Sequence, residues 1–236
     1  MCTVSFVNSN GKYIITSNRD EKVAREKAIE PKIHLVNHKK IFFPKDKKAG
    51  GTWYAVDDNA NVVVLLNGAK EKHELKSNYK KSRGLVVLDL ISSESVILFW
   101  ESINLENIEP FTLVVFENQK LYQLQWNELD KEMIQLDTSK NYIWSSSTLY
   151  TVSIREQRAV WFYSFLESKK SVSELDILNF HKNTEDGNQE YGLVINRNNL
   201  LKTLSITQTV IEKNKVSISH HDLIVNQEFS NSFIVI

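Results

Sequence analysis

The residue with the clearest chemical potential is Cys2, the only cysteine of the 236-residue chain. A small second residue permits removal of the initiator methionine, which would leave a thiol and a free α-amino group on one residue. The amine has a reference pKa of about 7.7–8.0 and the thiol one of about 8.5. Near pH 7 part of the amine is therefore neutral and can accept the thiol proton. Cys2 could be a nucleophile that carries its own base; the alternative is a small buried residue that starts an edge strand.

A predicted β-hairpin places Cys2 opposite a charged segment. Residues 2–17 form two stretches rich in β-branched and aromatic side chains around Asn8-Ser9-Asn10-Gly11. A two-residue Asn-Gly turn would pair Cys2 with Arg19, whereas a four-residue loop would pair it with Ser17. Both registers bring Cys2 to the same short segment of the second strand.

That segment contains the groups that could assist a nucleophile. Side chains alternate along a strand, so Asn18 and Asp20 share one face and Arg19 points to the other. The carboxylate could hold a terminal ammonium in place, and the arginine could bind a substrate carboxylate. The alternative is that Arg19-Asp20-Glu21-Lys22 is a solvated charge cluster at the end of a strand.

These residues carry a resemblance to a known family. Met1-Cys2 followed by Asn18-Arg19-Asp20-Glu21 resembles the NRDE family, also called the transport and Golgi organisation protein 2 family. Three further matches occur in the family order: Gly50-Gly51-Thr52-Trp53, Leu66-Asn67 and Ser82-Arg83-Gly84. The matches cover about the first hundred residues, and the remainder of the chain matches more loosely.

The family is in turn similar to N-terminal-nucleophile hydrolases of the penicillin V acylase and bile salt hydrolase group. That resemblance implies an α+β fold, the four-layer αββα sandwich of these hydrolases. It also implies that Cys2 is nucleophile and base, that Asp20 orients its amine, and that Asn67 donates to an oxyanion. The alternative for Asn67 is a structural one, because Asn67-Gly68 is also a favourable type I′ turn.

The resemblance also suggests residues that bind the substrate: Asn18, Arg19, Trp53, Arg83, Ser146 and Lys202. Two of these depart from the pattern of the hydrolases. Ser146 occupies the place of an asparagine and offers one donor hydrogen rather than two. Lys202 occupies the place of an arginine and lacks the planar fork that binds a carboxylate with two bonds.

The remaining elements are predicted from periodicity and turn residues. We expect strands at 41–44, 53–56, 62–66, 112–116, 121–126, 191–195, 203–211, 216–220 and 232–236. We expect helices at 82–91, 95–100 and 153–167, and a further one that opens at 173 and runs toward 181. In the long helix, Val160, Tyr163, Phe165 and Leu166 are expected to face inward. Strand pairs, helices and strand pairs again predict two antiparallel sheets with helical outer layers.

The six histidines do not predict a metal site. His220 and His221 would point to opposite faces of a strand, and most of the histidines are expected at the surface. Haem needs only one axial histidine, so haem binding stays open. Ser82-Arg83-Gly84 could bind an anion at the N-terminus of a helix or could simply cap that helix.

The composition is that of an ordinary globular protein, with 42% hydrophobic and 25% charged residues. The 29 basic residues balance 29 acidic ones, which argues against nucleic acid as a partner. Apolar runs are too short to span a bilayer, and no signal peptide is evident. We therefore expect a cytoplasmic protein with a single domain over 1–236, with a homo-oligomer as an open alternative.

Three hypotheses follow. The first is an enzyme that cleaves a carbon–nitrogen amide bond of a small molecule through Cys2, with no cofactor. The second is a cytoplasmic haem-binding or haem-trafficking protein on the same scaffold, which some members of the NRDE family suggest. The third is a structural or interaction protein with a relic site, which a large distance between Cys2 and Asp20 would favour.

Overall fold

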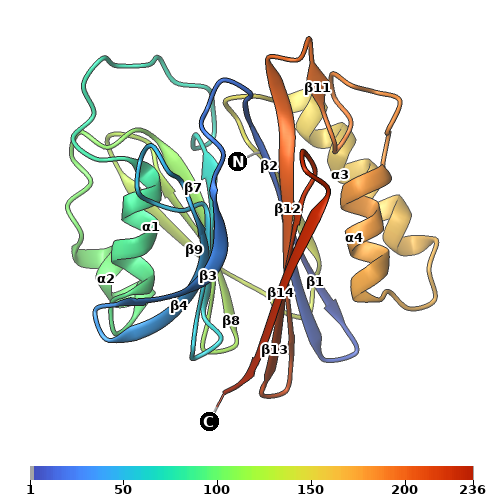
Figure 1. Ribbon diagram of the computed structural model, residues 1–236, viewed down its shortest axis with the longest axis horizontal. Helices are drawn as coiled ribbons and strands as arrows, with labels where there is room; N and C mark the ends of the chain where they lie inside the picture. The colour runs from blue at the N-terminus through green and yellow to red at the C-terminus, as the bar shows by residue number, and fades with distance from the viewer. Residues whose placement is uncertain (1–2, 236) are drawn as a thin grey trace. The chain divides into compact units, whose positions relative to one another are not determined.

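The computed structural model describes residues 3–235, and these form two compact units. The first unit contains residues 3–25 and 139–234, and the second contains residues 26–138 together with 235. Each unit is built on one antiparallel sheet of seven strands (Figure 1). The two predicted antiparallel sheets are therefore confirmed.

The sheet of the first unit joins the two ends of the chain. Its strands are β1 (Thr3–Ser9), β2 (Lys12–Lys22), β10 (Tyr142–Ser145), β11 (Asn196–Arg197), β12 (Leu201–Glu212), β13 (Lys215–Asp222) and β14 (Gln227–Ile234). The order is β10-β1-β2-β12-β13-β14, and β11 pairs with β12. The C-terminal strand β12 thus lies directly beside the N-terminal hairpin.

Two helices cover one face of this sheet, α3 (Val152–Glu167) and α4 (Glu174–Asn183) (Figure 1). The helix α4 begins at Ser173, which forms a capping box with Asp176. Phe162 of α3 and Phe180 of α4 pack together with Val7 and Ile14 of the hairpin. This apolar cluster fixes the helices on the strands that carry the N-terminal motif.

The sheet of the second unit is a meander of consecutive strands in sequence order. Its strands are β3 (Ile29–Val36), β4 (Lys39–Lys45), β5 (Tyr54–Asp57), β6 (Val62–Asn67), β7 (Phe111–Glu117), β8 (Lys120–Trp126) and β9 (Lys131–Leu136). The helices α1 (Arg83–Ile91) and α2 (Val96–Ser102) connect β6 to β7. Val62, Val63 and Val64 in the middle of the sheet have no exposed surface.

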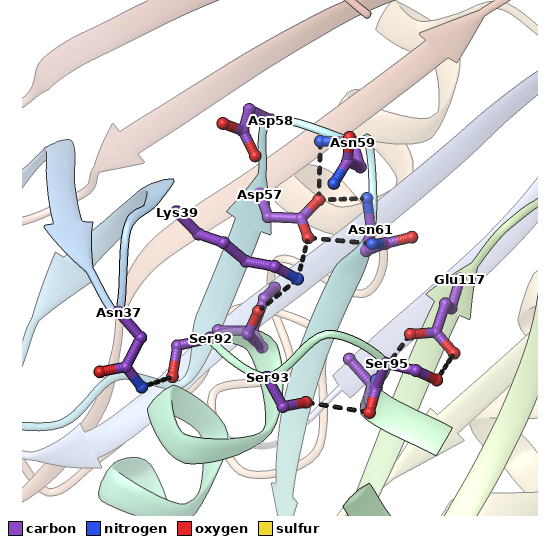
Figure 2. A network of polar contacts seen from close by, with 12 residues as sticks. Asn37, Lys39, Asp57, Asp58, Asn59, Asn61, Ser92, Ser93, Ser95 and Glu117 are labelled. Atoms are coloured by element: carbon purple, nitrogen blue, oxygen red, sulfur yellow. Dashed lines mark hydrogen bonds and ion pairs between the residues drawn. The ribbon is translucent and has the colours of Figure 1, made fainter. Parts of the chain in front are cut away.

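Polar side chains fix several ends of these elements (Figure 2). Asp57 ends β5 and accepts bonds from the backbone N–H groups of Asn59 and Asn61, at 3.0 and 2.8 Å, which holds the turn into β6. Lys39 donates to the same carboxylate at 3.3 Å. Burial raises the pKa of Asp57, whereas these bonds act in the opposite direction. The Glu117 carboxylate accepts from the backbone N–H of Val96 at 2.6 Å and so caps α2.

Two sequence expectations are wrong, for physical reasons that the structure shows. Val160 and Tyr163 are 62% and 44% exposed, because the buried positions of α3 are Arg158 and Phe162. Because a charged residue, Arg158, occupies a buried position, the apolar residues of α3 did not indicate which face of the helix is buried.

Residues 191–195 are not a strand. The backbone N–H of Gly192 bonds to Asn188 O and that of Leu193 to Thr184 O, so this segment forms turns after α4. Leu193 and Ile195 are buried, which produced the alternation of a strand in the sequence. The strands β3, β9 and β10 were not among the predicted elements.

Candidate functional site

The N-terminal strand β1 begins between β2 and β10. Thr3 pairs with Asn18 of β2 on one side and with Ser145 of β10 on the other. Cys2 itself lies outside the described residues. The turn before β2 has two residues, since Ser9 pairs with Lys12 and both Asn10 and Gly11 have positive φ angles, 53° and 81°. The two-residue turn is therefore confirmed and the four-residue loop is excluded.

Asp20 is buried and held by two hydroxyl groups from distant parts of the chain. Tyr150 donates its phenolic O–H to Oδ2 at 2.8 Å, and Thr203 of β12 donates its hydroxyl to Oδ1 at 2.5 Å. The Thr203 oxygen in turn accepts from the backbone N–H of Ile195 at 2.9 Å. Each carboxylate oxygen thus has one fixed donor, which sets the orientation of the group.

Arg158 is the most unusual side chain near Asp20, and no sequence pattern indicated it. It has no exposed surface, and among residues 3–235 no carboxylate forms an ion pair with it. Its guanidinium donates to Thr3 Oγ1 at 2.7 Å and to the carbonyl oxygens of Tyr191 and Gly192. Its charged carbon lies 3.6 Å from the centre of the Tyr150 ring, a cation–π contact. Tyr150 therefore connects a buried cation to the Asp20 carboxylate.

Asn18 belongs to a second buried network on the same face of the sheet. Its side-chain N–H₂ donates to the carbonyl oxygens of His181 and Leu193, at 3.0 and 2.7 Å. The side-chain carbonyl oxygen of Asn18 therefore faces His181 Nδ1 at 2.6 Å. Because this oxygen can only accept a hydrogen bond, the ring proton of His181 lies on Nδ1. His181 Nε2 then accepts from the hydroxyl of Ser5 at 2.7 Å. This network ties α4 to both strands of the N-terminal hairpin.

Four of the six histidines keep exposed surface, as expected for most of them, and two are buried. His181 is fully buried, and desolvation, together with the charge of Arg158, lowers its pKa to about 3. His220 is also buried, and desolvation lowers its pKa to about 4. In residues 3–235 no group of His, Cys, Asp and Glu side chains could hold a metal ion.

Arg19 and Lys202 lie on the face opposite to Asp20. Lys202 pairs with Glu21 in the register between β12 and β2, one residue from the Thr203 and Asp20 pair, so alternation turns it to the other face. Arg19 and Asp20 are 4% and 3% exposed, so the alternative that they belong to a solvated charge cluster is excluded. Ser146 follows β10 directly, is buried, and shares a hydrogen bond of 2.9 Å with Thr148.

The other sequence candidates, Asn67, Trp53 and Arg83, belong to the second unit. Asn67 is the last residue of β6 and pairs with Phe111, and only Gly68, not Asn67, has a positive φ angle. The type I′ turn is therefore excluded for Asn67-Gly68, because that turn needs positive φ at both residues. Trp53 is buried just before β5.

Arg83 opens α1 and bonds to Glu109 at 3.0 Å and to the carbonyl oxygen of Pro110 at 3.1 Å. The Ser82 side chain forms no capping hydrogen bond with α1, so the prediction that Ser82 caps this helix through its side chain is wrong. Instead, Gly84 accepts from the backbone N–H of Thr52 at 3.0 Å, which joins two of the motifs described above.

This architecture is the fold of N-terminal-nucleophile hydrolases. The C2A mutant of conjugated bile acid hydrolase from Clostridium perfringens matches with a TM-score of 0.59 and 10% identity, over 99% of this chain and 97% of that one. Penicillin V acylase from Agrobacterium tumefaciens matches with a TM-score of 0.60 and 8% identity, over 98% and 85% of the two chains. An N-acylethanolamine-hydrolyzing acid amidase orthologue from Caenorhabditis elegans matches with a TM-score of 0.62 and 12% identity, over 89% and 92%. The predicted fold class is confirmed.

The family model of Transport and Golgi organisation 2 matches residues 1–234, and the chain belongs to this family. Comparison with curated protein sequences returned no significant match. None of the helices in the described range 3–235 is long and apolar enough to cross a membrane.

Proposed function

We propose that this protein is a hydrolase that cleaves a carbon–nitrogen amide bond of a small molecule, with Cys2 as the nucleophile. The observation that carries the proposal is the fixed carboxylate of Asp20 on β2. It lies one strand away from β1, whose first described residue, Thr3, follows Cys2 in the chain. The hydrolase fold and the family membership support the same reaction class.

In the proposed reaction, the α-amine of a mature Cys2 accepts the thiol proton, and the sulfur attacks the amide carbon. The tetrahedral intermediate collapses, the C–N bond breaks, and the amine product leaves with the proton. Water then cleaves the thioester, which releases the acid and restores the thiol. Asp20 would hold the terminal ammonium, and a donor such as the amide of Asn67 would stabilise the oxyanion, a contribution of about 10²–10³ in rate.

The substrate-binding residues of this proposal are the ones taken from the resemblance. Arg19 is suited to a carboxylate of the substrate because it combines a permanent charge with a planar fork. Ser146 could add a single hydroxyl donor, and Lys202 a point charge. Trp53 and Arg83 stay substrate-binding predictions in the second unit.

Mass spectrometry tests the nucleophile directly. The mature chain is incubated with an acylating probe, and we expect one adduct, on the peptide that begins with Cys2. Cys2→Ala and a chain that keeps Met1 should both remain unlabelled, the second because its amine is no longer on the cysteine. Labelling of Cys2 at equal rates with and without Met1 would exclude the self-activating mechanism, and the absence of any adduct would exclude the nucleophile.

Haem binding stays a prediction from the family resemblance. His181 already uses both ring nitrogens in hydrogen bonds and could bind iron only after one of these bonds is broken. An absorbance titration with haem tests this alternative, and an unchanged spectrum would remove it.

A further inference from the structure

A cleft of about 300 Å³ lies within the second unit, at the edge of the sheet where β6 and β8 end and β9 begins. Its walls include Lys70, Lys72, His73, Gln125, Asp130 and Glu132. Liquid water occupies about 30 Å³ per molecule, so the cleft can hold a ligand of roughly ten non-hydrogen atoms. Two buried groups in its wall show which chemistry such a ligand needs.

The first group is the side-chain carbonyl of Gln125. The hydroxyl of Thr112 donates its only hydrogen to Gly68 O at 2.9 Å, so its oxygen can only accept from Gln125 Nε2, at 3.1 Å. This bond fixes which end of the amide is oxygen. Gln125 is 9% exposed, and its Oε1 is buried without a hydrogen-bond donor among residues 3–235. A buried acceptor without a donor is costly, and a ligand could supply the missing hydrogen.

The second group is the imidazole of His73. Its Nε2 lies 3.3 Å from the Glu109 carboxylate, which also pairs with Arg83 at 3.0 Å. A carboxylate only accepts, so Nε2 carries a proton that points to Glu109. His73 Nδ1 is buried and likewise has no partner in the described part of the chain. The wall of the cleft therefore contains one buried acceptor without a donor, Gln125 Oε1, and one buried ring nitrogen without a partner among residues 3–235.

The charges of the wall favour a cation. Glu71, Asp130 and Glu132 contribute three carboxylates, whereas Lys70 and Lys72 contribute two ammonium groups. Lys70 is bonded to Glu132 at 2.6 Å, which offsets one charge of each sign and leaves two carboxylates against one ammonium group in the wall. We propose that this cleft binds a small organic cation with N–H donors, an ammonium or guanidinium compound. This inference does not rest on the proposed acyl transfer, because binding is measured without turnover.

Calorimetric titration of the full chain with n-butylguanidinium chloride tests the proposal, at an ionic strength of roughly 0.15 M. We expect saturable binding and a shift of the Gln125 side-chain amide resonance in the ¹⁵N-labelled protein. The neutral n-butylurea has nearly the same shape, and we expect it to bind at least tenfold more weakly. No saturable binding of the guanidinium compound would overturn the proposal, and equal binding of the urea would overturn the assignment of a cation.

Variants of one strand locate the site. Gln125→Met should lower the affinity at least tenfold, because it removes the acceptor at similar volume. Gln123→Met is the matched control, since Gln123 lies two residues away on the same face of β8 and outside the cleft, and its affinity should change less than twofold. Equal affinities of these two variants would overturn the proposal. If Gln125→Met does not fold, Asp130→Asn at an exposed position should still weaken binding about two- to fivefold, and unchanged affinity would count against it.

Discussion

Arg158 shows how one side chain can link the start of the chain to the Asp20 carboxylate. A buried guanidinium is tolerated only when its donors find partners, and here they find one hydroxyl and two carbonyl oxygens. Its positive charge lies on the face of Tyr150, whose O–H points to Asp20. The opposite charges are thus separated by one aromatic ring rather than joined in an ion pair.

Replacement of Arg158 by Met should lower the free energy of unfolding by about 2–4 kcal/mol, because Thr3 Oγ1 and two carbonyl oxygens lose their donors. Urea titration measures the change. Arg155→Met on the same helix is the control. The Arg155 side chain forms no hydrogen bond or ion pair with residues 3–235, so this change should cost less than about 1 kcal/mol. A similar loss in both variants would show that the network around Arg158 adds little.

His181 predicts a dependence of stability on pH. Its pKa is 6.5 in an unfolded chain and about 3 in the folded protein, so its contribution is complete above pH 6.5. Below that pH the unfolded chain binds a proton that the folded chain does not. The free energy of unfolding should fall with decreasing pH by up to about 1.36 kcal/mol per unit, until the folded pKa is reached.

Urea titrations at several pH values between 7 and 5 measure this slope. His181→Gln should reduce it, although the variant is less stable at neutral pH because Asn18 and Ser5 lose their partner. His38→Asn, at an exposed position, should keep the slope of the unchanged protein. An identical slope in all three proteins would show that His181 does not titrate as described.

The sequence could indicate Asn18 and Asp20 because they are neighbours in one motif on one predicted strand. It could not indicate Tyr150, Arg158 or Thr203, because these come from parts of the chain more than a hundred residues away. Their roles depend on which strands lie side by side, and a tyrosine, a buried arginine and a threonine carry no local signal of such contacts.

At the scale of elements, the loop before β5 and the start of α1 fit together through glycines. A Cβ on Gly51 would overlap the backbone of Gly84, and a Cβ on Gly84 would lie 2.8 Å from Thr52 O. The Gly50-Gly51-Thr52-Trp53 and Ser82-Arg83-Gly84 motifs therefore share one close backbone contact, which positions the helix that carries Arg83.

Gly84→Ala should destabilise the protein even though alanine is favoured over glycine inside a helix by about 1 kcal/mol. The added methyl group would push α1 away from Thr52 and weaken the bond between Thr52 N and Gly84 O. Thermal unfolding measures the effect. Gly187→Ala is the control, because a Cβ there meets nothing within 4 Å and should be neutral or slightly stabilising. A stabilised Gly84→Ala would contradict the close contact.

Local turn chemistry made several elements predictable. The Asn10-Gly11 turn, the turn at 117–120 and the capped start of α4 all occur where the sequence placed them. The prediction of a strand at 191–195 was wrong because carbonyl oxygens of this segment bond to Arg158 and its N–H groups bond to earlier turns. No local sequence pattern reveals these contacts. The strand β9 was not predicted because its residues are largely exposed and lack the alternation of a half-buried strand.

At the scale of the molecule, the order of strand pairs and helices predicted two antiparallel sheets with helical outer layers, and the family resemblance supplied the fold class itself. The division of the chain is less visible from sequence. The first unit combines residues 3–25 with 139–234, and no linker rich in proline or glycine marks either junction. Pairing of β2 with β12 brings together residues nearly two hundred positions apart, so this sheet is expected to form slowly.

The bond between Thr203 and Asp20 has a consequence for folding during synthesis. On the ribosome, the hairpin emerges first, yet the strand that holds its carboxylate is among the last parts to be translated. The Asp20 carboxylate therefore lacks its donor from Thr203 for most of synthesis, and this bond can form only after β12 has left the exit tunnel.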